Sequence, residues 1–243
     1  MCCCLAAVSA LTIAMGIKDI TSKTANQNNY QENFRFAQLT YVALGDSITE
    51  GANSFDGAVG VVQYPYPALV QINLALKSSV NCGISGSTVA SGATSYYPMC
   101  QRYVDMPSGD IVSVMGGVND YARNVPLGTI DDTNTDTFYG ALNTLASGLK
   151  QKYPNAFIFF MTPYKYSWYL SPNGNGNTLE QFAIAVKDIC NKYDLPCLDM
   201  YKLGKFEDEM YDERSDGLHP SQNFFVSYTA PQIAQFIRDN FNK

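Results

Sequence analysis

The chain has 243 residues, of which 46% are hydrophobic and 16% charged, and its formal net charge at pH 7 is -6. This length and hydrophobic content favour one sizeable domain with a full core. An acidic chain without a block of Lys or Arg is a poor partner for nucleic acid, so an uncharged small molecule or a saccharide is the better candidate ligand. With only one histidine, a histidine-rich zinc site is excluded.

The first 38 residues differ in character from the rest of the chain. Residues 2–17 are apolar, but this run is shorter than the roughly 20 residues of a membrane span and lacks a basic leader. It predicts an export signal or an acylated anchor, with a start at Met15 as an alternative. On this basis we expect a secreted or cell-surface protein, with a cytoplasmic one as the alternative, and any membrane association through this stretch. Residues 19–38 are polar, which predicts a tether before a domain at 39–243.

After the tether, short β-branched runs alternate with longer helical patterns, which is typical of a parallel sheet covered by helices. The predicted strands are Thr40–Leu44, a weak one ending near Asn81, Asp110–Met115, Ala156–Thr162 and Cys197–Met200. The sequence therefore predicts an α/β fold with a five-stranded, doubly wound sheet. Ligands of such sheets bind outside the carboxyl ends of the strands.

Helical periodicity is clear in the second half of the chain. Apolar residues recur at helical spacing in residues 136–153, and again one element later. The two stripes are Phe138, Leu142, Leu145 and Leu149, and Phe182, Val186, Ile189 and Tyr193. A last helix or pair of helices is predicted from about residue 222 to 241, with Pro231 marking a break or a new start.

Four short motifs carry side chains suited to acyl transfer, each at a predicted strand end or loop. Ser47 follows the first strand in Gly-Asp-Ser, Gly86 lies in a Gly/Ser-rich loop, and Asn119 follows a Gly pair after the third strand. Asp216 and His219 stand three residues apart near the C-terminus. A serine hydroxyl needs a base to take its proton, and the base needs a carboxylate to orient it. An asparagine N–H is a good donor to an oxyanion.

Taken together, and in this order, the four motifs resemble the Ser, Gly, Asn and His blocks of the SGNH hydrolases, the GDSL esterase and lipase superfamily. The resemblance covers residues 40–240 and implies a flavodoxin-like three-layer α/β/α fold, no metal or cofactor, and ester or thioester hydrolysis through an acyl-serine. It implies a triad of Ser47, Asp216 and His219, and an oxyanion hole formed by the backbone N–H groups of Ser47 and Gly86 with the Asn119 side chain. Gly83 is a competing choice for the second block.

The neighbouring carboxylates Asp46 and Asp120 are predicted to hydrogen-bond to backbone N–H groups and to have no chemical role. Two departures from the family pattern are visible. The first block reads Gly-Asp-Ser-Ile rather than Gly-Asp-Ser-Leu, and Ser221-Gln222-Asn223-Phe224-Phe225 replaces the Gly-His-like continuation often seen after the histidine. The second departure bears on substrate preference.

The segment after the fourth predicted strand is aromatic and then rich in Gly and Asn. Its Tyr164, Tyr166 and Trp168 are predicted to bind substrate, because sugar rings stack on aromatic side chains. The alternative is that these aromatic rings pack inward. We expect a short-chain or carbohydrate O-acetyl esterase, with a lipase, lysophospholipase or thioesterase as the alternative, and a non-catalytic binding module as a third possibility. Of the seven cysteines, Cys82, Cys100, Cys190 and Cys197 lie in the domain, either paired in two disulfides or free.

Overall fold

The computed structural model describes residues 35–55, 58–92, 97–166, 171–203 and 217–241. A five-stranded sheet has the order β4-β1-β5-β6-β7, and every neighbouring pair is parallel. The strands are β4 (Ser78–Gly83), β1 (Thr40–Gly45), β5 (Ile111–Met115), β6 (Phe157–Met161) and β7 (Cys197–Leu198). In chain order this is the flavodoxin-like arrangement 2-1-3-4-5, which confirms the predicted fold.

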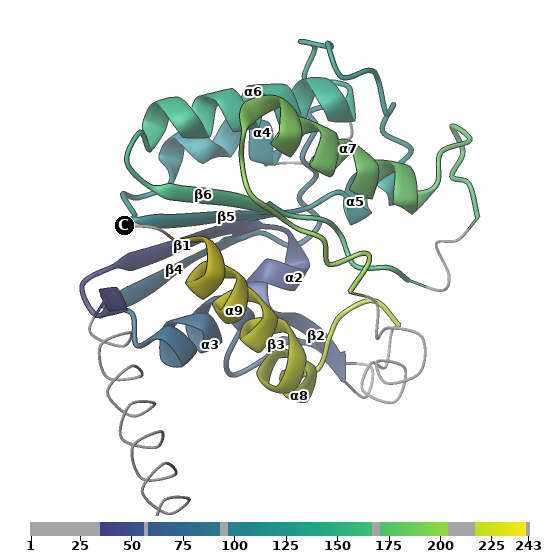
Figure 1. The fold of residues 1–243 in the computed structure, drawn as a ribbon. Helices are drawn as coiled ribbons and strands as arrows, with labels where there is room; N and C mark the ends of the chain where they lie inside the picture. The colour runs from purple at the N-terminus through teal and green to yellow at the C-terminus, as the bar shows by residue number, and fades with distance from the viewer. Residues whose placement is uncertain (1–34, 56–57, 93–96, 167–170, 204–216, 242–243) are drawn as a thin grey trace, which may run out of the picture.

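Helices cover both faces of the sheet (Figure 1). One layer contains α4 to α7, and the other contains α3 with α8 and α9. The bounds are α2 (Ser47–Glu50), α3 (Tyr66–Leu74), α4 (Met99–Arg102), η1 (Tyr103–Asp105), α5 (Val118–Ala122), α6 (Phe138–Lys152), α7 (Leu179–Tyr193), α8 (Gln222–Phe224), η4 (Phe225–Thr229) and α9 (Ala230–Asn240). The sheet is therefore enclosed, and ligand access is left to the loops at its edges.

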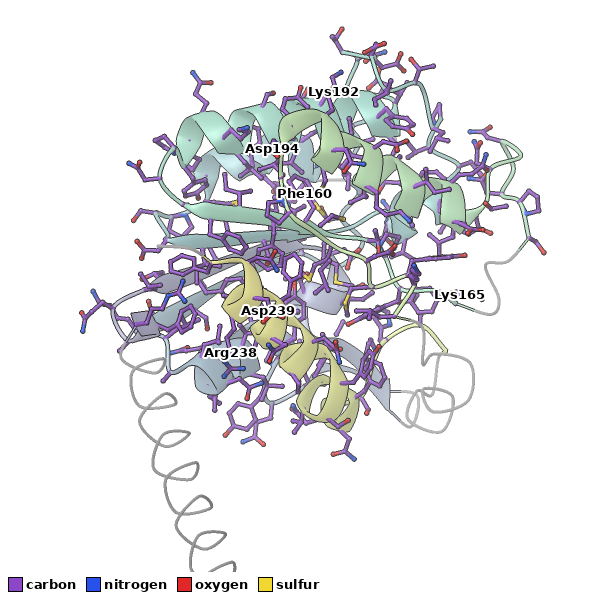
Figure 2. The ribbon with its side chains drawn as sticks, viewed as in Figure 1. Phe160, Lys165, Lys192, Asp194, Arg238 and Asp239 are labelled. Carbon is purple, nitrogen blue, oxygen red and sulfur yellow. The ribbon has the colours of Figure 1, made fainter. Side chains whose placement is uncertain are left out.

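The core lies between the sheet and the two helix layers. All residues of β5 are buried, as are those of β1 after its first, which explains their near-continuous apolar runs. Figure 2 shows Phe160 of β6 at the centre of the molecule, between the layers. The predicted stripe of α6 is buried along its whole length, and so is that of α7 except for the half-buried Tyr193. Phe36, from the segment predicted as a tether, is buried against Phe241 with ring centroids 5.6 Å apart.

The C-terminal helical region is interrupted just before Pro231, as the sequence predicts. A π-helical turn, η4, separates α8 from α9, and Pro231 stands in the first turn of α9. Proline lacks the backbone N–H that an α-helix would use, so the preceding turn widens instead of continuing the α-helical ladder.

The structure differs from the predicted elements in two places. The last strand ends at Leu198 rather than Met200, because the chain turns there: the Met200 N–H donates to the Leu198 carbonyl at 2.9 Å and the Tyr201 N–H to Thr162 Oγ1 at 2.8 Å. An unpredicted antiparallel pair, β2 (Ala52–Phe55) and β3 (Ala58–Val61), follows α2 directly. This hairpin is short, and Gly60 interrupts its pattern of side chains.

Candidate active site

The candidate nucleophile Ser47 stands at the sharp turn between β1 and α2. Gly45 ends β1, and a Cβ at this position would lie 1.8 Å from Thr49 Oγ1, so only glycine fits. The Asp46 carboxylate caps α2 by accepting a hydrogen bond from the Ile48 N–H at 3.0 Å. This turn places Ser47 at the carboxyl end of β1, beside β5, where the strand order reverses and α/β sheets bind ligands.

His219 reaches this serine from the far end of the chain. Its Nε2 lies 2.9 Å from Ser47 Oγ, a distance suited to general-base catalysis, although 172 positions separate the two residues. The loop that carries His219 is held by Gln222, whose Oε1 accepts a hydrogen bond from the Tyr64 N–H at 2.8 Å. The Gln222 Nε2 donates to the Tyr64 carbonyl at 2.9 Å. Asp216, the predicted third member of the triad, lies outside the described residues.

The two other predicted oxyanion donors follow the carboxyl ends of β4 and β5, the strands that flank β1. Gly86 follows β4 and adopts a left-handed φ of 73°, which glycine tolerates and other residues rarely do. Asn119 follows β5, and its Nδ2 donates to the Ser87 carbonyl at 3.0 Å, so that the second and third blocks are directly connected. A primary amide has two N–H donors, so this bond leaves one for an acyl oxygen.

The two buried carboxylates beside these motifs bind backbone N–H groups, as predicted. Asp120 accepts hydrogen bonds from Val89 N at 2.9 Å and Ala90 N at 2.9 Å, which secures the chain just after the Gly86 loop. Burial raises the pKa of Asp120 to about 6. Burial also raises the pKa of Asp46 to about 7, opposed by the Ile48 N–H and reinforced by the charge of Asp120.

The nucleophile helix is also connected to the Gly86 loop. Glu50, the last residue of α2, accepts hydrogen bonds from the backbone N–H of Ser85 at 2.8 Å and from its hydroxyl. Asn81 donates to the Thr49 carbonyl at 2.7 Å and accepts from the Gly83 N–H at 2.9 Å. Gly83, the competing choice for the second block, is the last residue of β4, and a Cβ there would lie 2.1 Å from Glu50 N. Its role is therefore close packing of β4 against α2.

Glu50 and Gln222 were not predicted as site residues. Glu50 stands in the first motif, directly before Gly51, so its place there was the available signal. Gln222 was noted only as part of the segment after the histidine, and no local pattern pairs it with Tyr64, which is 158 positions away.

Two of the three aromatic residues predicted to bind substrate are buried in the core. Tyr164 and Tyr166 are only 0% and 2% exposed. The Tyr164 hydroxyl lies 2.8 Å from Thr229 Oγ1, and its ring packs edge-on against Phe224. A buried ring offers no face for a sugar, so the inward-packed alternative is correct for these two tyrosines. Trp168 lies outside the described residues.

The described residues also show the state of four cysteines and whether metal sites or membrane-spanning helices are present among them. Cys82, Cys100, Cys190 and Cys197 are free thiols in the structure. Across the described residues, no group of three His, Cys, Asp or Glu side chains is placed to hold a metal ion. Of the helices in these ranges, none has the length and apolar character to cross a membrane.

Comparison with known proteins identifies the family of the chain. The model of the GDSL-like lipase/acylhydrolase family matches residues 43–223. No protein of curated function matches the sequence. A Lactobacillus plantarum protein of known structure is 29% identical, with a TM-score of 0.71 over 85% of this chain and 99% of its own.

Two further structures are similar over nearly their whole length. A possible lipase from Chitinophaga pinensis is 23% identical, with a TM-score of 0.64 over 83% of this chain and 98% of its own. A variant of an acetyl-xylooligosaccharide esterase from Geobacillus is 25% identical, with a TM-score of 0.56 over 83% of this chain and 95% of its own. Because the family model spans most of the chain, including Ser47, Gly86, Asn119 and His219, this protein belongs to the GDSL-like lipase/acylhydrolase family.

Proposed function

We propose that this protein is a serine esterase that hydrolyses carboxylic esters through an acyl-serine intermediate. The observation that carries the proposal is the 2.9 Å contact between His219 Nε2 and Ser47 Oγ at the carboxyl edge of the sheet. A serine beside an imidazole is activated as a nucleophile when the imidazole is neutral and accepts the hydroxyl proton. The proposed reaction class is acyl transfer to water.

In the proposed mechanism, Ser47 Oγ attacks the ester carbonyl carbon while His219 Nε2 takes the hydroxyl proton. The carbonyl oxygen becomes an oxyanion, which accepts hydrogen bonds from the backbone N–H groups of Ser47 and Gly86 and from the Asn119 amide. The tetrahedral intermediate collapses, and His219 returns the proton to the departing alcohol. Water then attacks the acyl-serine by the same steps, which releases the acid and restores Ser47. Asp216 is the proposed carboxylate that orients the imidazole.

We further propose that the substrate is a short-chain ester, with O-acetylated carbohydrate as the preferred class. The similarity to an acetyl-xylooligosaccharide esterase supports this choice. Trp168, beside the Gly/Asn-rich segment, is the aromatic candidate for stacking against a sugar ring. The lipase alternative keeps the same catalytic residues and differs in the length of acyl chain that it accepts.

The test is hydrolysis of p-nitrophenyl esters from acetate to dodecanoate and of acetylated xylan, by the wild type, Ser47→Ala and His219→Gln. Each variant should lose about 10⁴-fold or more in kcat, because serine and base act as one unit. Ser227→Ala is the matched control, since this serine is exposed and its hydroxyl donates to the Asn223 carbonyl of its own helical segment at 2.8 Å. It should retain full activity.

The acyl-chain series separates the two substrate classes. Activity confined to acetate and butyrate, together with acetate release from xylan, supports the carbohydrate esterase. A maximum at long chains favours the lipase. Wild-type hydrolysis that persists in Ser47→Ala on every ester would refute the acyl-serine mechanism.

A further inference from the structure

One half-buried guanidinium connects the nucleophile turn to the loop that carries Gly86. Arg102, the last residue of α4, donates through Nη2 to the Gly45 carbonyl and through Nη1 to the Cys82 carbonyl at 2.5 Å. Its Nε donates to the Tyr97 carbonyl at 3.1 Å, and Nη2 also lies 3.3 Å from Ser87 Oγ. Four acceptors from three separate stretches of chain therefore meet one side chain.

The positions of these acceptors relate Arg102 to the proposed reaction. Gly45 is two residues before Ser47, and Ser87 directly follows Gly86. The Gly45 carbonyl and the Cys82 carbonyl belong to β1 and β4, which are neighbouring parallel strands, so Arg102 spans the pair at its carboxyl edge. The Ser87 hydroxyl donates in turn to the Tyr97 carbonyl at 2.7 Å, which closes the network.

The chemistry of arginine suits this position. A guanidinium has five N–H donors in a rigid plane and keeps its charge when buried, whereas a lysine has one ammonium on a flexible chain. Burial lowers the pKa of Arg102, and the nearby Cys82 and Asp46 oppose that shift. Hydrogen bonds from a charged donor are stronger than those between neutral groups, so the network holds its acceptors firmly.

We propose that Arg102 is a positioning residue, which sets the distance between the Ser47 turn and the Gly86 loop. The proposal rests on the esterase function above, because the oxyanion donors of that reaction come from both of these segments. The alignment of nucleophile and donors determines the barrier to acyl transfer, and a misplacement of about 1 Å costs on the order of 100-fold in rate. The Glu50–Ser85 and Asn81–Thr49 bonds remain when Arg102 is removed, so we expect misalignment of the two segments and not unfolding.

The test compares Arg102→Ala and Arg102→Lys with the control Arg238→Ala. Arg238 also donates from a guanidinium to a carbonyl, that of Asn73, at 2.7 Å. Figure 2 shows Arg238 near the end of α9, on the side of α3 and away from the candidate site. The control therefore removes a similar bond from a different part of the molecule.

Three measurements are made on each protein: kcat and KM for p-nitrophenyl acetate, recovery of activity on addition of millimolar guanidinium, and backbone hydrogen–deuterium exchange. Arg102→Ala should lower kcat by about 10- to 100-fold with KM nearly unchanged, and Arg102→Lys should fall between it and the wild type. Added guanidinium, far below denaturing molar concentrations, should restore part of the activity of Arg102→Ala. Exchange should rise in residues 45–51 and 83–90 of this variant alone.

A purely structural role predicts a different pattern. Arg102→Ala would then lower the melting temperature, as Arg238→Ala does, while kcat of the folded enzyme and exchange in residues 45–51 and 83–90 stay at wild-type values. That result would overturn the proposal. If the wild type shows no Ser47-dependent hydrolysis, the esterase function fails, and the exchange measurement still decides whether Arg102 holds the two segments together.

Discussion

Replacing Asp46 by asparagine should remove a pH dependence from the stability of the fold. Asp46 is 1% exposed, and burial raises its pKa from 3.8 to about 7. Between these two values the folded protein binds more protons than the unfolded chain, so the free energy of unfolding falls as the pH rises through this window. A shift of about three units at about 1.4 kcal/mol per unit corresponds to roughly 4 kcal/mol. This stabilisation is fully present below pH 3.8 and lost above pH 7.

Asparagine has no charge at any pH and keeps the oxygen that accepts from the Ile48 N–H. The assay is urea unfolding of the wild type and Asp46→Asn at each pH unit from 4 to 8. The wild type should lose roughly 4 kcal/mol relative to the variant across this range. Asp120 is present in both proteins, so the difference between the two curves reports Asp46 together with its charge coupling to Asp120. Parallel stability curves would refute the account of Asp46 as a carboxyl whose ionised form burial disfavours.

Asp132→Asn is a control of opposite sign. Hydrogen bonds from Thr129 and Thr137 lower the pKa of Asp132 in the folded state. Its ionised form therefore stabilises the fold at all pH values above the unfolded pKa, and the stabilisation is lost only as the pH falls through the folded value. The difference between the wild type and this variant should stay constant from pH 5 to 8, where the Asp46 difference changes most.

Three further substitutions test the site and the core. Asn119→Ala removes the amide that bonds the Ser87 carbonyl and the proposed oxyanion, so steady-state kinetics should show kcat lower by about 100- to 1000-fold, and an unchanged kcat would exclude this role. Gly86→Ala places a Cβ 2.9 Å from Arg123 Nη2 on a residue with φ 73°. Urea unfolding should therefore show a loss of about 1–3 kcal/mol in the free energy of unfolding, and kcat should fall. Wild-type values for both would show that this backbone conformation causes no strain. Leu145→Ala empties a position that is 0% exposed, and should cost about 2–5 kcal/mol in urea unfolding while kcat of the folded enzyme is retained.

Much of the fold was predictable because its signals are local. The strands that are buried on both faces, such as β5, are runs of apolar residues, and α6 and α7 show their buried stripes directly in the sequence. The short edge strand β7 and the β2–β3 hairpin were predicted poorly or not at all. The extent of β7 depends on where the chain turns away from the sheet, as the hydrogen bond from the Tyr201 N–H to Thr162 Oγ1 shows, rather than on periodicity.

The sequence by itself determined the order of the elements, the family and the residues suited to acyl transfer, because motif composition and hydrophobic spacing are written along neighbouring positions. Only the tertiary structure decided which of these residues meet. It brings His219 Nε2 to Ser47 Oγ across 172 positions, buries Tyr164 and Tyr166 in the core, and places Arg102 across the carboxyl ends of β1 and β4. Such contacts depend on the path of the whole chain through a packed core, and no local pattern encodes that path.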